Sequence, residues 1–148
     1  MMNLLGTAAA PIEVLLVEDS PGDVRLTREA LRDAKVQVVL NVVSDGVEAM
    51  EFLARTGKFS NAPRPNIILL DLNLPRLDGR EVLEAIKRDP SLMSIPVIIL
   101  TTSESHTDII RSYRLNANCF VTKPVDLDVF IQVFHFWLSL ARLPQETA

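Results

Sequence analysis

Acidic residues close two of the apolar runs in this chain. The run IEVLLVED (12–19) ends in Glu18 and Asp19, and the run NIILLD (66–71) ends in Asp71. Singly, each acid has an ordinary explanation, because carboxylates stabilise helix N-termini and aspartate is common in turns. Three carboxylates gathered at one edge of a sheet would instead repel one another unless a cation offset their charge. The combination therefore predicts a cation site.

Two further polar side chains accompany later apolar runs. Thr101 lies near the end of IPVIILTTS (95–103), and Lys123 lies in NCFVTKP (118–124). Mg²⁺ prefers oxygen ligands and is usually held by one or two carboxylates together with phosphate oxygens. A lysine and a hydroxyl donor complete the groups that stabilise a phosphoryl group as it passes to an oxygen nucleophile. We therefore interpret Asp71 as that nucleophile.

These side chains can meet only if the apolar runs lie side by side in one sheet. Runs of strand length alternate with longer segments of helical spacing. We predict strands at 12–19, 36–44, 66–71, 95–103 and 118–124, and helices at 20–34, 45–55, 79–89, 107–116 and 126–143. This alternation indicates a parallel sheet with helices on both faces, because parallel neighbours need crossover connections. In such α/β sheets the ligand site lies beyond the carboxyl ends of the strands.

Local signals define the first helix start and one apolar helix face. Ser20 followed by Pro21 is typical of an N-cap and a first helical position. In the second helix, the spacing of apolar residues predicts one apolar face that contains Val47, Met50, Leu53 and Ala54.

Composition limits the other classes of function. The 148 residues, 48% of them apolar, suit one globular domain. The net charge of −4, with dispersed Lys and Arg, argues against nucleic-acid binding. The single Cys119 can form neither an internal disulfide nor a zinc cluster, and no apolar stretch reaches the length of a membrane span. We expect a cytoplasmic protein that does not contact membranes.

The motifs together resemble a known family. The acidic pair Glu18-Asp19, the turn DLNLPRLDG that begins at Asp71, the strand that ends in Thr101 and the KP pair at Lys123 resemble the response-regulator receiver domain of two-component signalling. The resemblance covers residues 11–142, which leaves 1–10 as a flexible arm and 143–148 as a tail. It implies an α/β, flavodoxin-like (βα)5 three-layer sandwich, with a five-stranded parallel sheet of order 2-1-3-4-5.

The resemblance also implies a metal site and a phosphoacceptor. Asp71 would take a phosphoryl group from the phosphohistidine of a sensor histidine kinase. Asp19 and Asp71 would bind Mg²⁺ (or Mn²⁺) directly, the backbone carbonyl of Asn73 would be a third ligand, and Glu18 would act largely through water. Such a domain is not an enzyme on free substrates; it catalyses only its own phosphorylation and dephosphorylation.

A conformational switch is implied beside that site. Thr101 would bond a phosphoryl oxygen after transfer, and Lys123 would pair with Asp71 or its phosphate. Phe120 occupies the switch position, where the family commonly has Tyr. Without a phenolic hydroxyl, the ring can move inward but cannot donate a hydrogen bond.

One loop and the last helix indicate a particular subfamily of receiver domains. The loop TGKFSNAPRPN (56–66) is longer than the connections usual in such domains. Together with the isolated-domain format and the segment FHFW (134–137), it is similar to the single-domain response regulators partnered with cyanobacterial phytochromes. A phytochrome-type kinase is therefore the expected partner.

The last predicted helix is apolar almost all the way round. An amphipathic surface helix should have one apolar stripe, so we predict that a second stripe forms an interface, with Phe130, Phe134, Phe136 and Trp137 as candidates. The expected partner is a second copy, through helix four, strand five and helix five. A loop or the N-terminal arm covering the surplus is the alternative.

Two alternative functions accompany the receiver hypothesis, and the two histidines need a separate interpretation. An aspartate-dependent phosphatase would need a second acid two residues after Asp71, where this chain has Asn73. A pseudo-receiver interaction module would be expected to have lost some of the acids, the threonine or the lysine, and none is missing. His106 and His135 lie far apart, which favours structural roles over metal or phosphohistidine chemistry.

Overall fold

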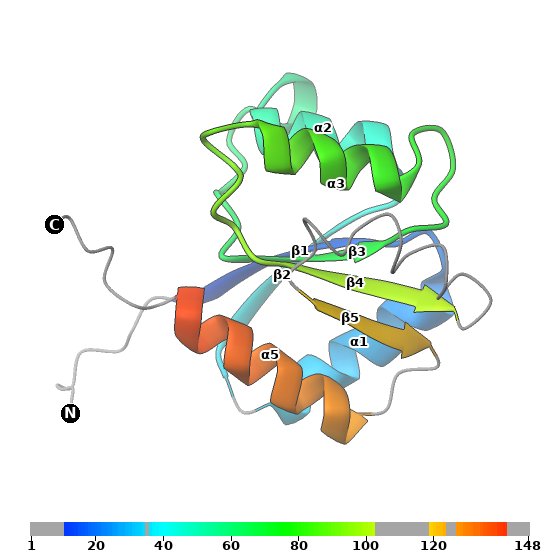
Figure 1. Cartoon of the computed structure of the whole chain (residues 1–148), viewed down its shortest axis with the longest axis vertical. Coiled ribbons are helices and arrows are strands. Elements are labelled where there is room, and N and C mark those ends of the chain that lie inside the picture. Colours follow the sequence, from blue (N-terminus) through cyan, green and yellow to red (C-terminus); the bar gives the residue numbers. More distant parts are fainter. Residues whose placement is uncertain (1–10, 35, 103–118, 124–126, 142–148) are drawn as a thin grey trace, which may run out of the picture.

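Five parallel strands form one sheet in the order β2-β1-β3-β4-β5 (Figure 1). The computed structural model describes residues 11–34, 36–102, 119–123 and 127–141. The strands are β1 (Ile12–Val17), β2 (Val38–Val43), β3 (Ile67–Asp71), β4 (Val97–Thr102) and β5 (Cys119–Lys123). The predicted α/β class with a parallel sheet is confirmed. The helix expected at 107–116 lies outside the described residues, as do the proposed arm and tail.

Helices cover both faces of the sheet. In Figure 1, α1 (Pro21–Asp33) and α5 (Leu127–Ala141) lie on one side, and α2 (Gly46–Ala54) and α3 (Gly79–Arg88) lie on the other. Each face has its own buried apolar cluster, so the central strands are covered on both sides. All five residues of β3 are buried, as expected for a strand enclosed by two helical layers. Among the described helices, none is long and apolar enough to cross a membrane.

Side-chain caps begin the helices. The Asp23 backbone N–H donates to Ser20 Oγ at 3.3 Å, and Pro21 occupies the first turn of α1, as the sequence predicts. The Glu48 backbone N–H donates to Asp45 Oδ1 at 2.8 Å at the start of α2. Asp78 and Glu81 form a capping box at the start of α3. These bonds satisfy N–H groups that a helix leaves unpaired at its first turn.

The apolar face predicted for α2 packs on the core only in part, through Met50 and Leu53, which are partly buried against it. The buried residues are Gly46, Ala49 and Phe52, whereas Ala54 is exposed. Apolar side chains occur on several sides of this helix, so the spacing alone fits more than one stripe. Phe52 decides the orientation, because its ring packs in the core and lies 5.4 Å from the tilted ring of Phe59 in the following loop.

The interface predicted on α5 also needs correction. Phe130 and Phe134 are 1% and 0% exposed and belong to the core cluster beneath α1 and α5. Both side chains are enclosed by this chain itself, so neither can form part of a surface for a partner. Trp137 packs partly against the same cluster, and Phe136 alone of the four is largely exposed, at 57%. The His135 ring bonds the Ala34 carbonyl at 2.8 Å, which supports a structural role for that histidine.

Candidate functional site

Three carboxylates meet where β1 and β3 end. The parallel register pairs Val17 with Leu70, so the next residues along each strand, Glu18 and Asp71, lie side by side at the carboxyl edge of the sheet. One carboxylate oxygen from each of Glu18, Asp19 and Asp71 lies within 4.8 Å of the others. Glu18 and Asp71 are only 2% and 4% exposed, and Asp19 faces solvent. The predicted gathering of these acids is confirmed.

Backbone N–H groups orient the two buried carboxylates. The Ser20 N–H donates to Glu18 Oε2 at 3.3 Å, and the Asn73 N–H donates to Asp71 Oδ1 at 3.1 Å. Each N–H belongs to a residue two positions further along the chain. For Asp71 this is the pattern in which an aspartate side chain stabilises the turn that follows it. Both turns therefore hold the carboxylates in place as oxygen ligands.

The donor set fits a hard divalent cation. All three converging ligands are carboxylates, and oxygen donors suit Mg²⁺ and Mn²⁺ better than the softer metals that prefer sulfur or imidazole. Two of the carboxylates are buried, which increases their mutual repulsion in the absence of a cation. Glu18, Asp19 and Asp71 would hold the ion, with the exposed side of Asp19 leaving room for water or phosphate oxygens. The predicted ligand Asn73 lies beside Asp71, and its own side chain is exposed.

The loop after Asp71 packs tightly against two helix starts. An ideal Cβ built on Gly79 would lie 2.4 Å from the Asp71 carbonyl oxygen, so the first turn of α3 contacts the backbone of the phosphoacceptor candidate directly. A Cβ on Gly46 would lie 2.0 Å from the Leu77 carbonyl oxygen, which places the start of α2 equally close to the same loop. Only glycine allows backbone to approach this closely.

An ion pair adds a third anchor that the sequence did not reveal. Arg76, in the loop between β3 and α3, has a left-handed φ of 66°. Its Nη1 lies 3.1 Å from Oδ2 of Asp45, the N-cap of α2. Asp45 is 8% exposed, so the pair joins an exposed arginine to a mostly buried acid. The sequence gives no signal for this contact, because the contact depends on the path of the loop.

The remaining predicted residues lie on the neighbouring strands. The register pairs Asp71 with Leu100 and Thr102 with Lys123, so Thr101 and Lys123 reach the same carboxyl edge of the sheet. Phe120 pairs with Ile99, three residues before that end of β5. At these three positions the structure describes the backbone alone. The topology thus brings Thr101 and Lys123 to the edge that holds the acids, and their predicted side-chain roles stay predictions.

The doubly wound parallel sheet and the acid cluster at its carboxyl edge are the arrangement expected of a receiver domain. The chain matches the response regulator receiver domain model over residues 14–135. It therefore belongs to the family of response regulator receiver domains.

Named relatives are similar over nearly the whole chain. Response regulator Rcp1 of Synechocystis sp. is 49% identical over 138 residues, which cover 90% of this chain and 94% of Rcp1. The crystal structure of the phosphorylated cyanobacterial phytochrome response regulator RcpA has a TM-score of 0.79 at 48% identity and covers 92% of this chain and 100% of that one. The Mn²⁺-bound form of Rcp1 has a TM-score of 0.78 at 47% identity, with 90% and 99% covered.

The glycine contacts predict which glycine-to-alanine substitutions lower the stability of the protein and which do not. Gly79→Ala or Gly46→Ala should lower the free energy of unfolding by about 1–3 kcal/mol, because the added methyl forces backbone apart. Gly22→Ala is the matched control: it lies in the first turn of α1, a Cβ at this position would meet only Ser20 Oγ at 3.9 Å, and it should be neutral or slightly stabilising. Urea denaturation measures all three. Equal stability of Gly79→Ala and Gly22→Ala would contradict the close packing.

The crowding of the three acids predicts that the native protein and the Asp71→Asn variant differ in how a divalent cation changes their stability. Without divalent ions, Asp71→Asn should raise the free energy of unfolding by about 1–3 kcal/mol, because one of three repelling charges is removed. Mg²⁺ should then stabilise the native protein progressively and Asp71→Asn far less, since a ligand that binds only the folded state adds stability as its concentration rises. Thermal unfolding across a Mg²⁺ series measures both effects.

The control for this series is Asp33→Asn, which removes an exposed acid on α1 away from the site. It should follow the native protein at every Mg²⁺ concentration. A native protein whose thermal midpoint ignores Mg²⁺ would contradict the cation site.

Proposed function

We propose that this protein is a response regulator whose Asp71 accepts a phosphoryl group from the phosphohistidine of a sensor histidine kinase. The observation that carries the proposal is the convergence of Glu18, Asp19 and Asp71 within 4.8 Å at the carboxyl edge of the sheet. Membership of the receiver-domain family supports the same role. The chain is thus a carrier of the phosphoryl group, and its chemistry is limited to its own phosphorylation and dephosphorylation.

The transfer itself needs a correctly placed carboxylate. An oxygen of Asp71 attacks the phosphorus in line, the phosphorus–nitrogen bond of the phosphohistidine breaks, and the imidazole leaves with the bonding electrons. The Asn73 N–H bond to Oδ1 restricts the rotation of the Asp71 carboxylate and so helps to aim it for the attack. Positioning of this kind removes much of the entropic part of the barrier.

The surrounding groups balance the charge of the acceptor. Glu18, Asp19 and the Asn73 carbonyl complete the proposed cation site with Asp71. A bound Mg²⁺ or Mn²⁺ would neutralise phosphoryl oxygens that otherwise repel the carboxylate. Lys123 would add a second positive charge from β5.

The phosphorylated state would be transmitted by Thr101 and Phe120. Thr101 would bond a phosphoryl oxygen, and the Phe120 ring would then move inward. A phosphoryl group can bias two arrangements only through contacts that differ between them. With phenylalanine at the switch position, the difference comes from packing of the ring and not from a hydroxyl bond.

A phytochrome-type histidine kinase is the proposed donor. The similarity to Rcp1 and to the cyanobacterial phytochrome response regulator RcpA supports this pairing. The length of the match supports it further, because nearly all of each chain takes part.

Incubation with Mg²⁺ and acetyl phosphate tests the proposal. The native protein should gain a single phosphoryl group, visible by intact mass spectrometry. Asp71→Asn should gain none and keep its fold, since the amide has the same shape as the carboxylate. Asp78→Asn is a control acid seven residues on, expected to label like the native protein. Rapid release of phosphate with no accumulation of phosphorylated protein would identify a phosphatase, and absence of both label and phosphate release would identify a pseudo-receiver.

The corrected surface of α5 supports a homodimer through helix four, β5 and α5. Phe136 and Val129 are 57% and 48% exposed, and exposed apolar residues of this size often mark interfaces. Phe136→Ser should shift a dimer toward monomer without lowering the stability of the fold, because that side chain leaves the core intact. Sedimentation at micromolar concentration measures this. A monomer with and without acetyl phosphate would argue against the dimer.

A further inference from the structure

The outer edge of β2 carries backbone groups that pair with no other strand of the described chain. β2 is the terminal strand of the sheet and pairs with β1 alone. The Ile12 N–H donates to the Gln37 carbonyl at 2.8 Å, and the Glu18 N–H donates to the Val43 carbonyl at 3.0 Å. In a parallel ladder, alternate residues bond to the same neighbour. The odd-numbered residues of β2 therefore face β1, and the even-numbered ones turn their N–H and carbonyl groups outward.

This edge lacks the usual protection. The strand reads VVLNVV and contains no charge and no proline, the two features that most often keep other strands from adding to an edge. Val39 and Val42 are 40% and 37% exposed. Among the described residues, no segment pairs with the outer side of β2. The edge is thus open to a further strand.

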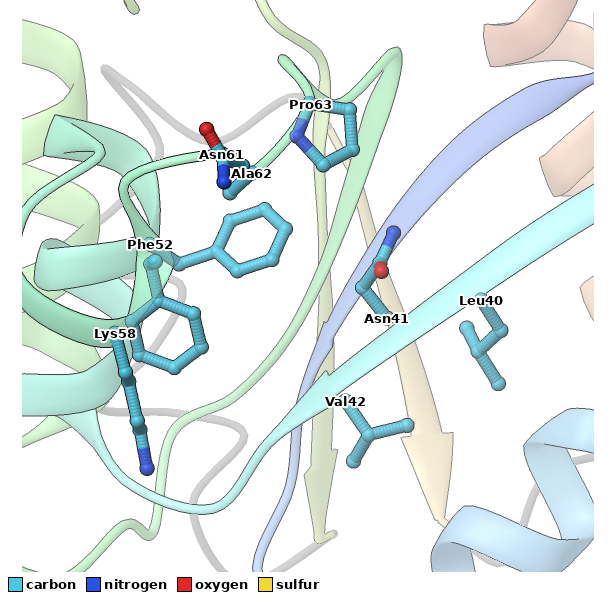
Figure 2. Close-up of a pocket in the computed structure, with 9 residues that line it drawn as sticks. Leu40, Asn41, Val42, Phe52, Lys58, Asn61, Ala62 and Pro63 are labelled. Atoms are coloured by element: carbon cyan, nitrogen blue, oxygen red, sulfur yellow. The ribbon is translucent and has the colours of Figure 1, made fainter.

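A hollow of about 440 Å³ lies on the α2 side of this edge (Figure 2). Phe52 from α2 and Ala62 and Pro63 from the long loop form its apolar wall opposite the strand. The loop is held in place by the contact between the Phe59 and Phe52 rings and by the 2.9 Å ion pair between Lys58 and Glu48. The long loop at 56–66 therefore forms one side of an apolar recess beside β2.

The tether at Glu48 involves one further group. The Ser44 backbone N–H and the Lys58 ammonium hold the pKa of the Glu48 carboxyl below its usual range. The loop thus remains paired to α2 at neutral pH, and the positive charge of Lys58 is already matched by an acid of the chain. The recess on this side is consequently suited to an uncharged side chain.

A second hollow of about 370 Å³ lies on the α1 side of the same edge. Leu40 lines both hollows, so they flank one stretch of strand. Arg28 and Arg32, one turn apart on α1, line the second hollow above Val38 and Leu31. Neither guanidinium takes part in a salt bridge with any residue that the structure describes. This recess is therefore suited to a carboxylate.

We propose that the outer edge of β2 binds an extended segment of a partner protein in which apolar and acidic residues alternate. Successive side chains of a strand point to opposite faces. A segment that adds to β2 would place apolar side chains beside Phe52 and acidic ones beside Arg28 and Arg32. Main-chain bonds then supply affinity, and the two recesses supply selectivity.

A second copy of the chain fits this edge less well. Two β2 strands related by a two-fold axis normal to the sheet would run antiparallel and would keep α1 of both copies on one face. Arg28 and Arg32 of each copy would then approach those of the other, and like charges facing across a strand pair are destabilising. The charge pattern therefore favours an acidic partner.

The test uses the full chain and a fluorescein-labelled synthetic decapeptide of alternating valine and glutamate. Fluorescence anisotropy should show saturable binding, and the same peptide with glutamine for glutamate should bind about fivefold more weakly, in line with two exposed charge pairs. The variant carrying Arg28→Gln and Arg32→Gln should lose the same factor for the glutamate peptide and nothing for the glutamine peptide.

Substitutions at Val42 test whether the peptide adds as a strand or is held only by charge attraction. Val42→Pro removes an outward N–H and fills the edge, a change that edge strands tolerate, and it should weaken binding at least tenfold. Val42→Thr keeps the N–H and should bind within twofold of the native protein. Hydrogen exchange followed by NMR should slow at the amides of Leu40 and Val42 when peptide is added, and should stay unchanged at Asn41, which already faces β1.

Three outcomes would overturn the proposal. The first is no binding, or equal binding of the two peptides. The second is unchanged exchange at Leu40 and Val42, a readout that holds even if Val42→Pro fails to fold. The third is a dimer of the protein alone that Val42→Pro dissociates, since the edge would then belong to a second copy.

Discussion

The repulsion among three carboxylates at one edge of the sheet is the constraint on which this molecule depends. Glu18 and Asp71 are nearly inaccessible to water, so solvent screens their charges poorly. A fold accepts such crowding only if positive charge relieves it, and a bound cation is one source of that charge. The same arrangement that lowers stability in the empty state creates affinity for a cation and for the electrophilic phosphorus of a phosphoryl group. Stability and function are therefore opposed at this one place.

The rest of the site keeps that strained cluster from relaxing. The loop after Asp71 could move its carboxylate away if it were free, but Gly79 and Gly46 let two helix starts press against the loop backbone. The pair between Arg76 and Asp45 fastens the middle of the same loop. Close packing resists displacement more strongly than a surface ion pair does. The close contacts at Gly79 and Gly46 therefore contribute most of the rigidity of the loop after Asp71. Arg76 contributes by fixing the path of that loop.

The sequence predicted the parts of the fold that follow from the alternation of strand-length and helical segments. Strands that end in acids had to bring Asp71 to the common edge once the sheet was parallel. It did not predict which side of a helix with several apolar stripes turns inward. It therefore missed Phe52 on the buried side of α2 and took Phe134 for a surface residue. Phe52 and Phe134 are oriented by neighbours distant in sequence. The contact of Arg76 with Asp45 was missed for a related reason: it requires a left-handed backbone at a residue that is not glycine.

β1 connects the two sites proposed for this protein. The Glu18 N–H bonds the Val43 carbonyl at the end of β2, while the Glu18 carboxylate lies in the acid cluster with Asp71. A strand added to β2 and a cation bound at the cluster would thus act on the same residue from opposite sides. Coupling between them requires that each favour one position of Glu18 over another. Because such linkage is reciprocal, any factor by which the cation changes the affinity for the added strand must equal the factor by which the strand changes the affinity for the cation.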